Sequence, residues 1–116
     1  MLTTYFANVR NLPHDVVPIA ISQTVPNSVR MLRYPALAPH SSILYKYKAD
    51  GDWGSYTVEY KKQLESLDPR EVFEDLVSLA GTDEIALVCY EGKNKDCHRH
   101  LVADWFKAVG IEVEEY

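Results

Sequence analysis

The sequence predicts an α/β domain: a small three-layer, Rossmann-like domain with a mostly parallel sheet of about four strands flanked by helices. Three observations support this prediction. Residues 85–90 are six apolar residues in succession, as in a strand that is covered on both faces of a parallel sheet. Segments with helical spacing of apolar residues lie on both sides of that run. The length of 116 residues suits one domain with one hydrophobic core, spanning residues 1–116.

The composition is that of an ordinary globular protein, with 47% apolar and 25% charged residues. A net charge of −5 argues against non-specific binding of nucleic acids. No apolar run approaches the roughly 20 residues that span a bilayer, so we expect no contact with a membrane. The first residues lack the features of a secretory signal, and we therefore expect a cytoplasmic protein whose two cysteines are thiols.

The N-terminal third contains two predicted strands and a long loop. Residues 3–7 and 16–22 favour β-structure and are bounded by turns. Pro18 counts against a central position for the early part of the second strand, because proline has no N–H to donate. Residues 24–40 contain three prolines and predict a loop of the length that is often functional.

Four helices and a last strand follow. Ser41 or Ser42 is a candidate cap for a helix over residues 41–49, and a second helix is expected over residues 52–67. Asp68 followed by proline begins a third helix that extends to Gly81. The fourth helix is expected over residues 97–109, and a fourth strand over residues 111–113.

The start of the fourth helix contains the most distinctive side chains. Successive residues of a helix are about 100° apart, which puts His98 at the middle of the apolar side. Cys97 and Arg99 lie at the edges of that side, and His100 lies among the polar residues, where we expect it to be solvated. The helix follows the carboxyl end of a buried strand, which is the edge of an open α/β sheet where ligands bind.

An anion is the ligand that this helix start favours. We expect Asp96 to be the N-cap, so that the amides of the first turn face the polar loop at 91–95. Arg99 could hold a phosphate or carboxylate with two hydrogen bonds, or could pair with a carboxylate such as Glu91. Cys89 would lie nearby as a nucleophile or as a small core residue.

A metal site is an alternative. Cys89, Cys97 and His98, together with Glu91, are residue types that bind zinc or iron. Their spacing matches no standard structural site, so our preferred interpretation has no metal. The sequence does not indicate which cofactor the protein uses. A cysteine-phosphatase loop is excluded, because Lys95 occupies the position where that loop needs arginine.

The same segment resembles a known family. Leu87-Val88-Cys89-Tyr90-Glu91, followed after a polar loop by the run from Cys97-His98-Arg99 to Trp105, resembles the signature of the domain of unknown function 488 family. Asn8-Val9-Arg10 with Pro13, Leu37-Ala38-Pro39, and Tyr60 before Leu64 resemble other segments of that family, although Asn8 replaces its usual aspartate. The resemblance implies a small α/β domain, and it directs attention to Arg10 and Tyr60 in addition to the residues above.

These observations lead to two hypotheses besides the metal site. The first is an enzyme or binding domain for a small phosphate- or nucleotide-like anion. Its catalytic residues would be Glu91, His98 and Cys89, and its ligand-binding residues would be Arg99, Arg10, Cys97 and Tyr60. The second is a non-catalytic protein-interaction module, with a partner surface formed by the proline-rich loop and the aromatic residues Tyr34, Tyr45, Tyr47 and Trp53.

Overall fold

The computed structural model of the protein describes residues 1–92 and 94–116. In this part of the chain one sheet has five strands, all parallel, in the order β3-β2-β4-β1-β5. The strands are β1 (Leu2–Tyr5), β2 (Val17–Ala20), β3 (Leu32–Arg33), β4 (Ile85–Cys89) and β5 (Glu114–Glu115). The predicted α/β class and parallel sheet are confirmed, and the sheet has one strand more than the approximate number we expected. Lys93, in the predicted polar loop, lies outside the described residues.

The four predicted α-helices begin and end within two residues of their predicted limits. They are α1 (Ser41–Asp50), α2 (Trp53–Glu65), α3 (Pro69–Ala80) and α4 (His98–Lys107). The structure also has the 3-10 helices η1 (Phe6–Asn11) and η2 (Pro35–Leu37), and η1 includes residues 6 and 7, which we predicted to belong to the first strand. The side chain of Asp68 caps α3 by accepting from the amide of Arg70, and Gly81 ends α3 with a φ of 74°. The N-cap of α1 is His40, without a side-chain hydrogen bond, rather than Ser41 or Ser42.

β4 is the central strand, and its position explains its sequence. All five of its residues are buried, and it pairs with β1 on one side and β2 on the other. A strand with neighbours on both edges and cover on both faces has no solvent-facing side, so polar residues do not alternate with apolar ones. The unbroken apolar run therefore identified this strand correctly.

Pro18 is accommodated in β2 although β2 lies between β3 and β4. The amides of Val17 and Ile21 donate toward β4, to the carbonyls of Glu84 and Val88. Because amides alternate in direction along a strand, the nitrogen of Pro18 faces the β3 side. β3 pairs with β2 only from Ile19 onward, so no hydrogen bond is lost at Pro18.

The last strand begins later in the chain than the sequence predicts. Ile111 closes the end of α4 by donating its amide to the carbonyl of Phe106. The chain reaches β1 only afterwards, where the amide of Glu114 donates to the carbonyl of Met1. The prediction of a strand over residues 111–113 was therefore wrong. Those residues connect α4 to the edge of the sheet, and the strand begins three residues later, at Glu114.

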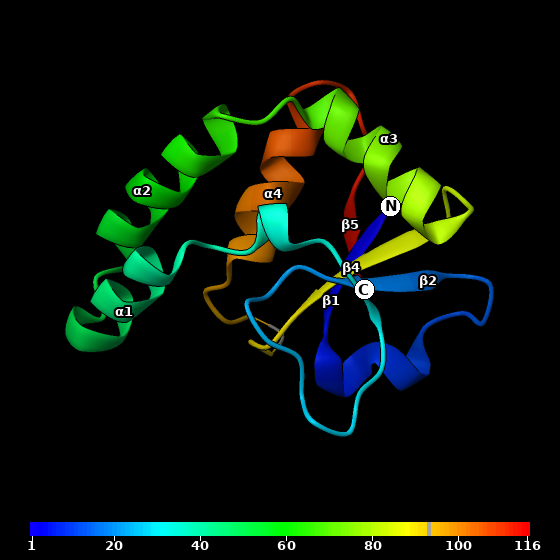
Figure 1. Ribbon diagram of the computed structural model, residues 1–116, viewed down its shortest axis with the longest axis horizontal. Helices are drawn as coiled ribbons and strands as arrows, with labels where there is room; N and C mark the ends of the chain where they lie inside the picture. The colour runs from blue at the N-terminus through cyan, green and yellow to red at the C-terminus, as the bar shows by residue number, and fades with distance from the viewer. Residues whose placement is uncertain (93) are drawn as a thin grey trace.

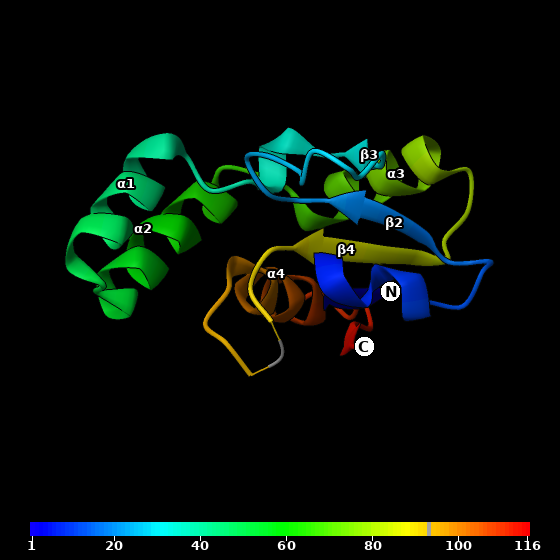
Figure 2. The same cartoon turned by 90° about the horizontal axis from the view of Figure 1, so that it is seen from below.

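The helices are distributed unevenly around the sheet. α3 and α4 lie on the same side of it, and η1 lies on the other side (Figure 1; Figure 2 shows η1 in front of β4). α1 and α2 pack against each other beyond the ends of β2 and β4, and α2 also packs against α4. The helical pair thus overhangs the carboxyl edge of the sheet. None of the helices in the described residues has the length and apolar character that a membrane span requires.

Tyr60 of α2 is a core residue and joins the helical pair to the sheet. Its side chain is completely buried, and its hydroxyl donates to the carbonyl of Leu37 at 2.5 Å. The ring of His98 meets it edge-on, with 5.4 Å between ring centroids. Burial raises the pKa of Tyr60 well above its ordinary value, so the hydroxyl stays protonated and donates this bond at physiological pH.

We expect the Tyr60→Phe substitution to lower the free energy of unfolding by about 1–3 kcal/mol, because it leaves the buried carbonyl of Leu37 without a donor. Urea denaturation followed by circular dichroism would measure this change. Tyr45→Phe is the matched control, since Tyr45 is 70% exposed, and it should change stability by no more than about 0.5 kcal/mol. Equal effects of the two substitutions would contradict a structural role for the Tyr60 hydroxyl.

Candidate active site at the carboxyl edge of the sheet

The sheet topology opens a crevice between β2 and β4. After β2 the chain continues to β3 on one side, and after β4 it continues through α4 to β5 on the other side. The two loops therefore diverge from neighbouring strands at the carboxyl edge, which is the arrangement at which ligands bind in open α/β sheets. The sequence predicts a site at this same edge, around the start of α4.

A cavity of about 580 Å³ lies there, within the size range of small-molecule sites. The loop after β2 and the loop after β4 line it, together with the start of α4 and the overhanging helical pair. Its lining includes Ser22, Gln23, Thr24, Tyr45, Tyr47, Lys48, Trp53, Tyr56, Tyr90, Glu91, Asp96, Cys97 and His98. The start of the last helix and Glu91 were predicted from the sequence, but Lys48, Tyr56 and Tyr90 were not.

Aromatic rings make one wall of the cavity. Trp53 and Tyr56 are stacked, with 4.7 Å between centroids and 18° between planes, and Tyr47 meets both rings edge-on. Tyr45, Tyr47 and Trp53, which we considered as a partner surface, therefore line the cavity. Tyr34 lies elsewhere, where its hydroxyl donates to Asp75 of α3.

The first turn of α4 presents unoccupied backbone donors beside the cavity. The N-cap is Cys97, with no side-chain hydrogen bond to the helix, so the prediction of Asp96 as the cap was wrong. Asp96 is instead an exposed residue of the cavity lining. The amide of His100 donates to the carbonyl of Cys97, whereas the amides of His98 and Arg99 have no hydrogen-bond partner within the described part of the chain and could bind a ligand group.

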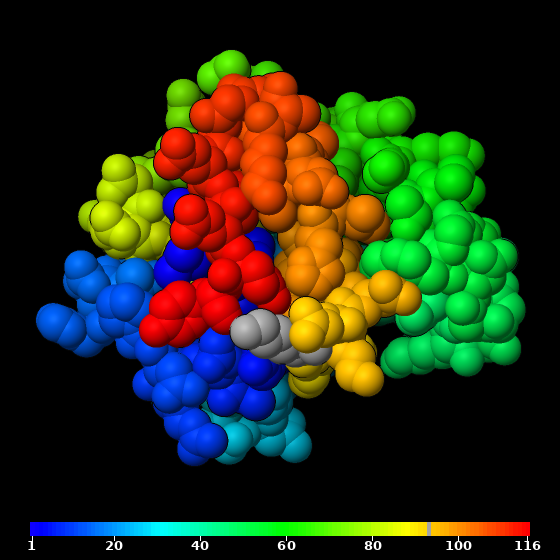
Figure 3. Space-filling model, turned by 180° about the vertical axis from the view of Figure 1, so that it is seen from behind, coloured from blue at the N-terminus to red at the C-terminus, as the bar shows by residue number. Residues whose placement is uncertain are grey.

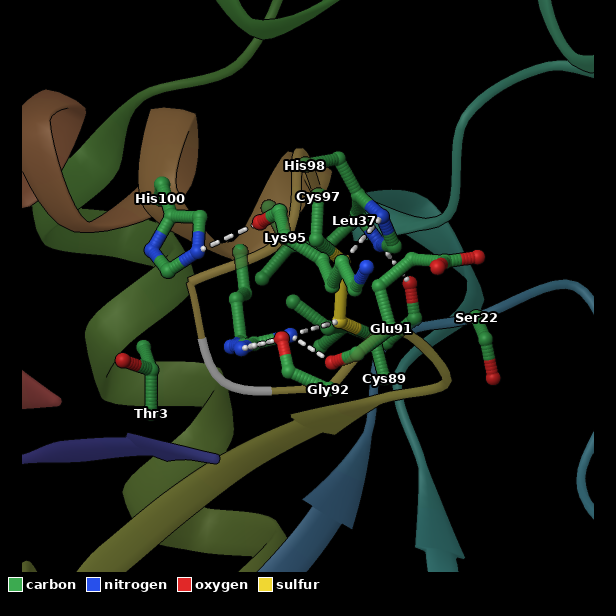
Figure 4. The surroundings of a disulfide bond; sticks show 12 residues. Thr3, Ser22, Leu37, Cys89, Glu91, Gly92, Lys95, Cys97, His98 and His100 are labelled. Carbon is green, nitrogen blue, oxygen red and sulfur yellow. Dashed lines mark hydrogen bonds between the residues drawn. A yellow bond between two sulfur atoms is a disulfide. The ribbon is translucent and has the colours of Figure 1, made fainter. Parts of the chain in front are cut away.

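Cys89 and Cys97 are joined by a disulfide (Figure 4). Our expectation of two thiols therefore differs from the structure. The physical reason is the short loop, which returns the chain so that Cys97, at the start of α4, meets Cys89, at the end of β4. Cys97 lines the cavity, whereas Cys89 is 1% exposed and is not among the lining residues.

His98 is neutral and held in one tautomer. Its side chain is buried, and Nε2 lies 2.6 Å from the carbonyl oxygen of Ile21, which can only accept a hydrogen bond. Nε2 therefore carries the proton, and Nδ1 faces the sulfur of Cys97 at 3.6 Å with a free lone pair. Burial, and next the charge of Arg99, lower the pKa of His98 to about 4 although the bond to Ile21 opposes them.

Arg99 is completely buried, and all of its five N–H donors have partners. Nε and Nη2 donate to the carboxylate of Glu115, at 2.8–3.1 Å. Nη1 donates to the sulfur of Cys89 at 3.1 Å and to the carbonyl of Glu91, and Nη2 donates to the carbonyl of Gly92. The ring of Tyr5 lies 5.6 Å from the guanidinium carbon. For Arg99 to bind a ligand anion, one of these contacts would have to break.

Glu115 is the carboxylate partner of Arg99, and it was not among the predicted site residues. β5 pairs in register with β1, which puts Glu115 opposite Thr3, and Thr3 donates a second hydrogen bond to the carboxylate. Figure 3 shows the carboxyl-terminal segment (red) running beside α4 (orange). Burial alone would raise the pKa of Glu115, but the bonds from Arg99 and Thr3 hold it below its ordinary value.

The remaining predicted residues lie in different surroundings. Glu91 is exposed and lines the cavity, and its backbone carbonyl, rather than its carboxylate, contacts Arg99. Arg10 is exposed on η1, outside the cavity lining. Tyr60 lies in the core behind His98. His100 is partly exposed, with Nε2 near the carbonyl of Lys95.

The three candidate metal ligands do meet. One ligand atom each from Cys89, Cys97 and His98 lies within 4.8 Å of the others. The two sulfurs are bonded to each other, so both thiolates would become available to a metal only after reduction of that bond. The three residues are of types that bind zinc, but only when Cys89 and Cys97 are reduced to thiols.

We expect Glu115→Gln to lower the free energy of unfolding by about 2–3 kcal/mol at pH 7, because it leaves a buried guanidinium without its counter-charge. This loss of stability should be smaller than for a fully buried ion pair, because the side chain of Glu115 is 29% exposed. Its folded-state pKa lies below the ordinary 4.5, so the stabilisation is present above that value and is lost as pH falls through the folded-state pKa. Urea denaturation from pH 7 to pH 3 should show a smaller acid loss in the variant.

Glu114→Gln is the control for this experiment. Glu114 is the exposed neighbour in the same short strand, and the same change in net charge should shift stability by no more than about 0.5 kcal/mol. If Glu114→Gln and Glu115→Gln had the same stability at pH 7, the ion pair with Arg99 would not be a main support of the fold.

Comparison with known proteins assigns the chain to a family. The family model described as "Active DUF488-N3 subclade" matches residues 3–110, which include β1, η1, β4 and the start of α4. The chain matches none of the curated proteins and none of the solved structures with which it was compared. A match over nearly the whole chain is consistent with the signature around Cys89 and Cys97, and the chain therefore belongs to the DUF488 family.

Proposed function

We propose that this protein is an enzyme that binds a small, nucleotide-like anion in the cavity at the carboxyl edge of the sheet. The observation that carries the proposal is the cavity of about 580 Å³, whose lining combines an aromatic wall with Glu91, Cys97 and His98. Few surface clefts combine such a size with so many convergent polar groups. The description of the matching family model as active also favours catalysis.

The aromatic wall suits a flat ring such as a nucleobase. Trp53 and Tyr56 are already stacked on each other, and Tyr45 and Tyr90 also line the cavity. A base gains roughly 1–3 kcal/mol by stacking on an aromatic side chain, whatever its identity. This contact accounts for a nucleotide-like ligand better than for a purely inorganic anion.

Lys48 and the start of α4 are the groups that would hold the anionic part. Lys48 lines the cavity as a cation, and the uncapped first turn adds backbone donors and the positive end of the helix dipole. Arg99 lies behind Cys97. It would contribute to anion binding through its positive charge and by holding the loop at Glu91 and Gly92 in position. Direct contacts of the ligand with Arg99, Arg10 or Tyr60 stay predictions.

Glu91 is the group we propose as general acid or base. Its exposed carboxylate lines the cavity just after the carboxyl end of β4, and Arg99 holds its backbone carbonyl. His98 offers Nδ1 as a second base, but this nitrogen faces Cys97 rather than the open cavity. A base on a fixed backbone with a free side chain can reach a bound substrate without disturbing the core.

Binding can be tested with a panel of nucleotides and phosphorylated metabolites, by thermal shift and then calorimetry. We expect at least one compound to bind, and Lys48→Ala to weaken its affinity by about tenfold, or 1.4 kcal/mol. Lys61→Ala removes an equal charge from the exposed face of α2 and should leave affinity unchanged. The proposal fails if no compound stabilises the protein, or if both lysine variants bind like the wild type.

Catalysis can be tested with the compound that binds. We expect Glu91→Gln to bind it with little change and to turn it over about 100-fold more slowly, because a general acid or base contributes roughly 10²–10⁴-fold. Product formation would be followed by chromatography, with Asp96→Asn as the control because it removes a second exposed carboxylate of the same lining. Equal losses in the two variants would mean that charge, rather than proton transfer, is involved.

A further inference from the structure

The two sulfurs of the Cys89–Cys97 disulfide face different surroundings. Cys97 is 4% exposed and is among the residues that line the cavity, so it is the cysteine that a molecule in the cavity meets first. Cys89 is 1% exposed and lies behind Cys97, at the end of the central strand. Thiol–disulfide exchange depends on which sulfur an incoming group can reach, so the two ends of this bond are not equivalent.

Each sulfur also has its own polar partner. Nη1 of Arg99 lies 3.1 Å from the sulfur of Cys89, and Nδ1 of His98 lies 3.6 Å from the sulfur of Cys97. A guanidinium stabilises a thiolate that leaves from Cys89. Because Nε2 of His98 holds the proton, Nδ1 can accept the S–H of a reduced Cys97. Both products of opening the bond therefore have a partner in place.

The loop between the cysteines does not depend on the disulfide alone. Arg99 binds the carbonyls of Glu91 and Gly92 within that loop, and Glu115 holds Arg99 from the other side. These contacts connect the end of β4 to the start of α4 without the sulfurs. The fold should therefore persist when the disulfide is reduced. A disulfide with a purely structural role would instead be needed to keep the protein folded.

From this arrangement we propose that Cys89 and Cys97 form a redox-active pair that exchanges with low-molecular-weight thiols entering the cavity. A thiolate attacks the sulfur of Cys97, the bond between the cysteines breaks, and Cys89 leaves as a thiolate beside Arg99. A second thiolate attacks the small-molecule sulfur of the mixed disulfide and releases Cys97. Two small thiols are thereby oxidised to one disulfide, and the protein disulfide is reduced to two thiols that take up the two protons.

The reverse direction uses the same contacts. Reduced Cys97 attacks a small disulfide, and one small thiol leaves. Cys89 then attacks the sulfur of Cys97, expels the second small thiol and restores the bond. Cys97 is thus the sulfur that exchanges with the outside, and Cys89 is the resolving residue. This activity needs the cavity but not the nucleotide-like ligand, so it can be tested independently of the proposed function.

The first experiment uses the wild-type protein in buffers with different ratios of reduced to oxidised glutathione. Samples are quenched in acid, treated with N-ethylmaleimide and analysed by intact mass. We expect a reversible change between no adducts and two adducts, while circular dichroism and cooperative thermal unfolding show that the reduced protein remains folded. Melting on reduction, or thiols that appear only after denaturation, would overturn the proposal in favour of a structural disulfide.

The second experiment separates the two sulfurs. With excess glutathione disulfide, Cys89→Ser should accumulate a stable mixed disulfide on Cys97. Cys97→Ser is its matched control and should react at least about tenfold more slowly, because Cys89 is buried behind the cavity wall. A faster reaction of Cys97→Ser, or no adduct in folded Cys89→Ser, would overturn the assignment.

Elemental analysis of the reduced protein, purified without an affinity tag, completes the test. A stoichiometric zinc or iron ion that blocks alkylation of both cysteines would overturn the redox proposal, because the same atoms would then hold a metal. Metal-free reduced protein supports it. If neither serine variant folds, the reversible cycling of the wild-type protein decides the question by itself.

Discussion

The buried guanidinium of Arg99 is the constraint on which the rest of this structure depends. Removing a charge from water costs several kcal/mol unless charge and hydrogen-bond partners replace the water. Here they come from the end of β4, the loop that follows it, and Glu115 in the last strand. The hydrogen-bond and charge partners that Arg99 needs therefore fix the relative positions of segments that are far apart in the sequence. One of these segments is the short edge strand β5, which pairing with β1 alone would hold weakly.

That constraint also separates the functions of three successive residues. Cys97 faces the cavity and the end of β4, His98 reaches back to Ile21, and Arg99 turns toward the carboxyl-terminal strand. Residues about 100° apart on one helical turn necessarily point in three directions. Because the arginine is occupied in structural bonds, only Cys97 and His98 of the three face the cavity. The motif thus combines a support for the fold with part of the cavity lining.

The sequence was sufficient where local patterns determine structure. The unbroken apolar run identified β4, proline and glycine set the limits of α3, and helical spacing correctly put His98 on the buried side. It was insufficient where the partner is distant. β3 has two exposed residues and exists only because β2 lies beside it, and the pairing of Arg99 with Glu115 depends on the register of β5 with β1. An arginine on the buried edge of a helix, followed by several glutamates, was the available signal for that ion pair.

The position of the cavity follows from topology more than from any single motif. β2 and β4 are neighbours, and the chain leaves them toward opposite sides of the sheet. The loops that follow them line the cavity and meet where the hydroxyls of Thr24 and Tyr90 lie 3.0 Å apart. The helical pair of α1 and α2 overhangs that edge, packs against α4 through α2, and contributes aromatic side chains to the cavity wall. Substitution of Tyr45 or Lys48 would thus alter the cavity wall, whereas Cys97 and His98 at the base are held by Cys89 and by the carbonyl of Ile21.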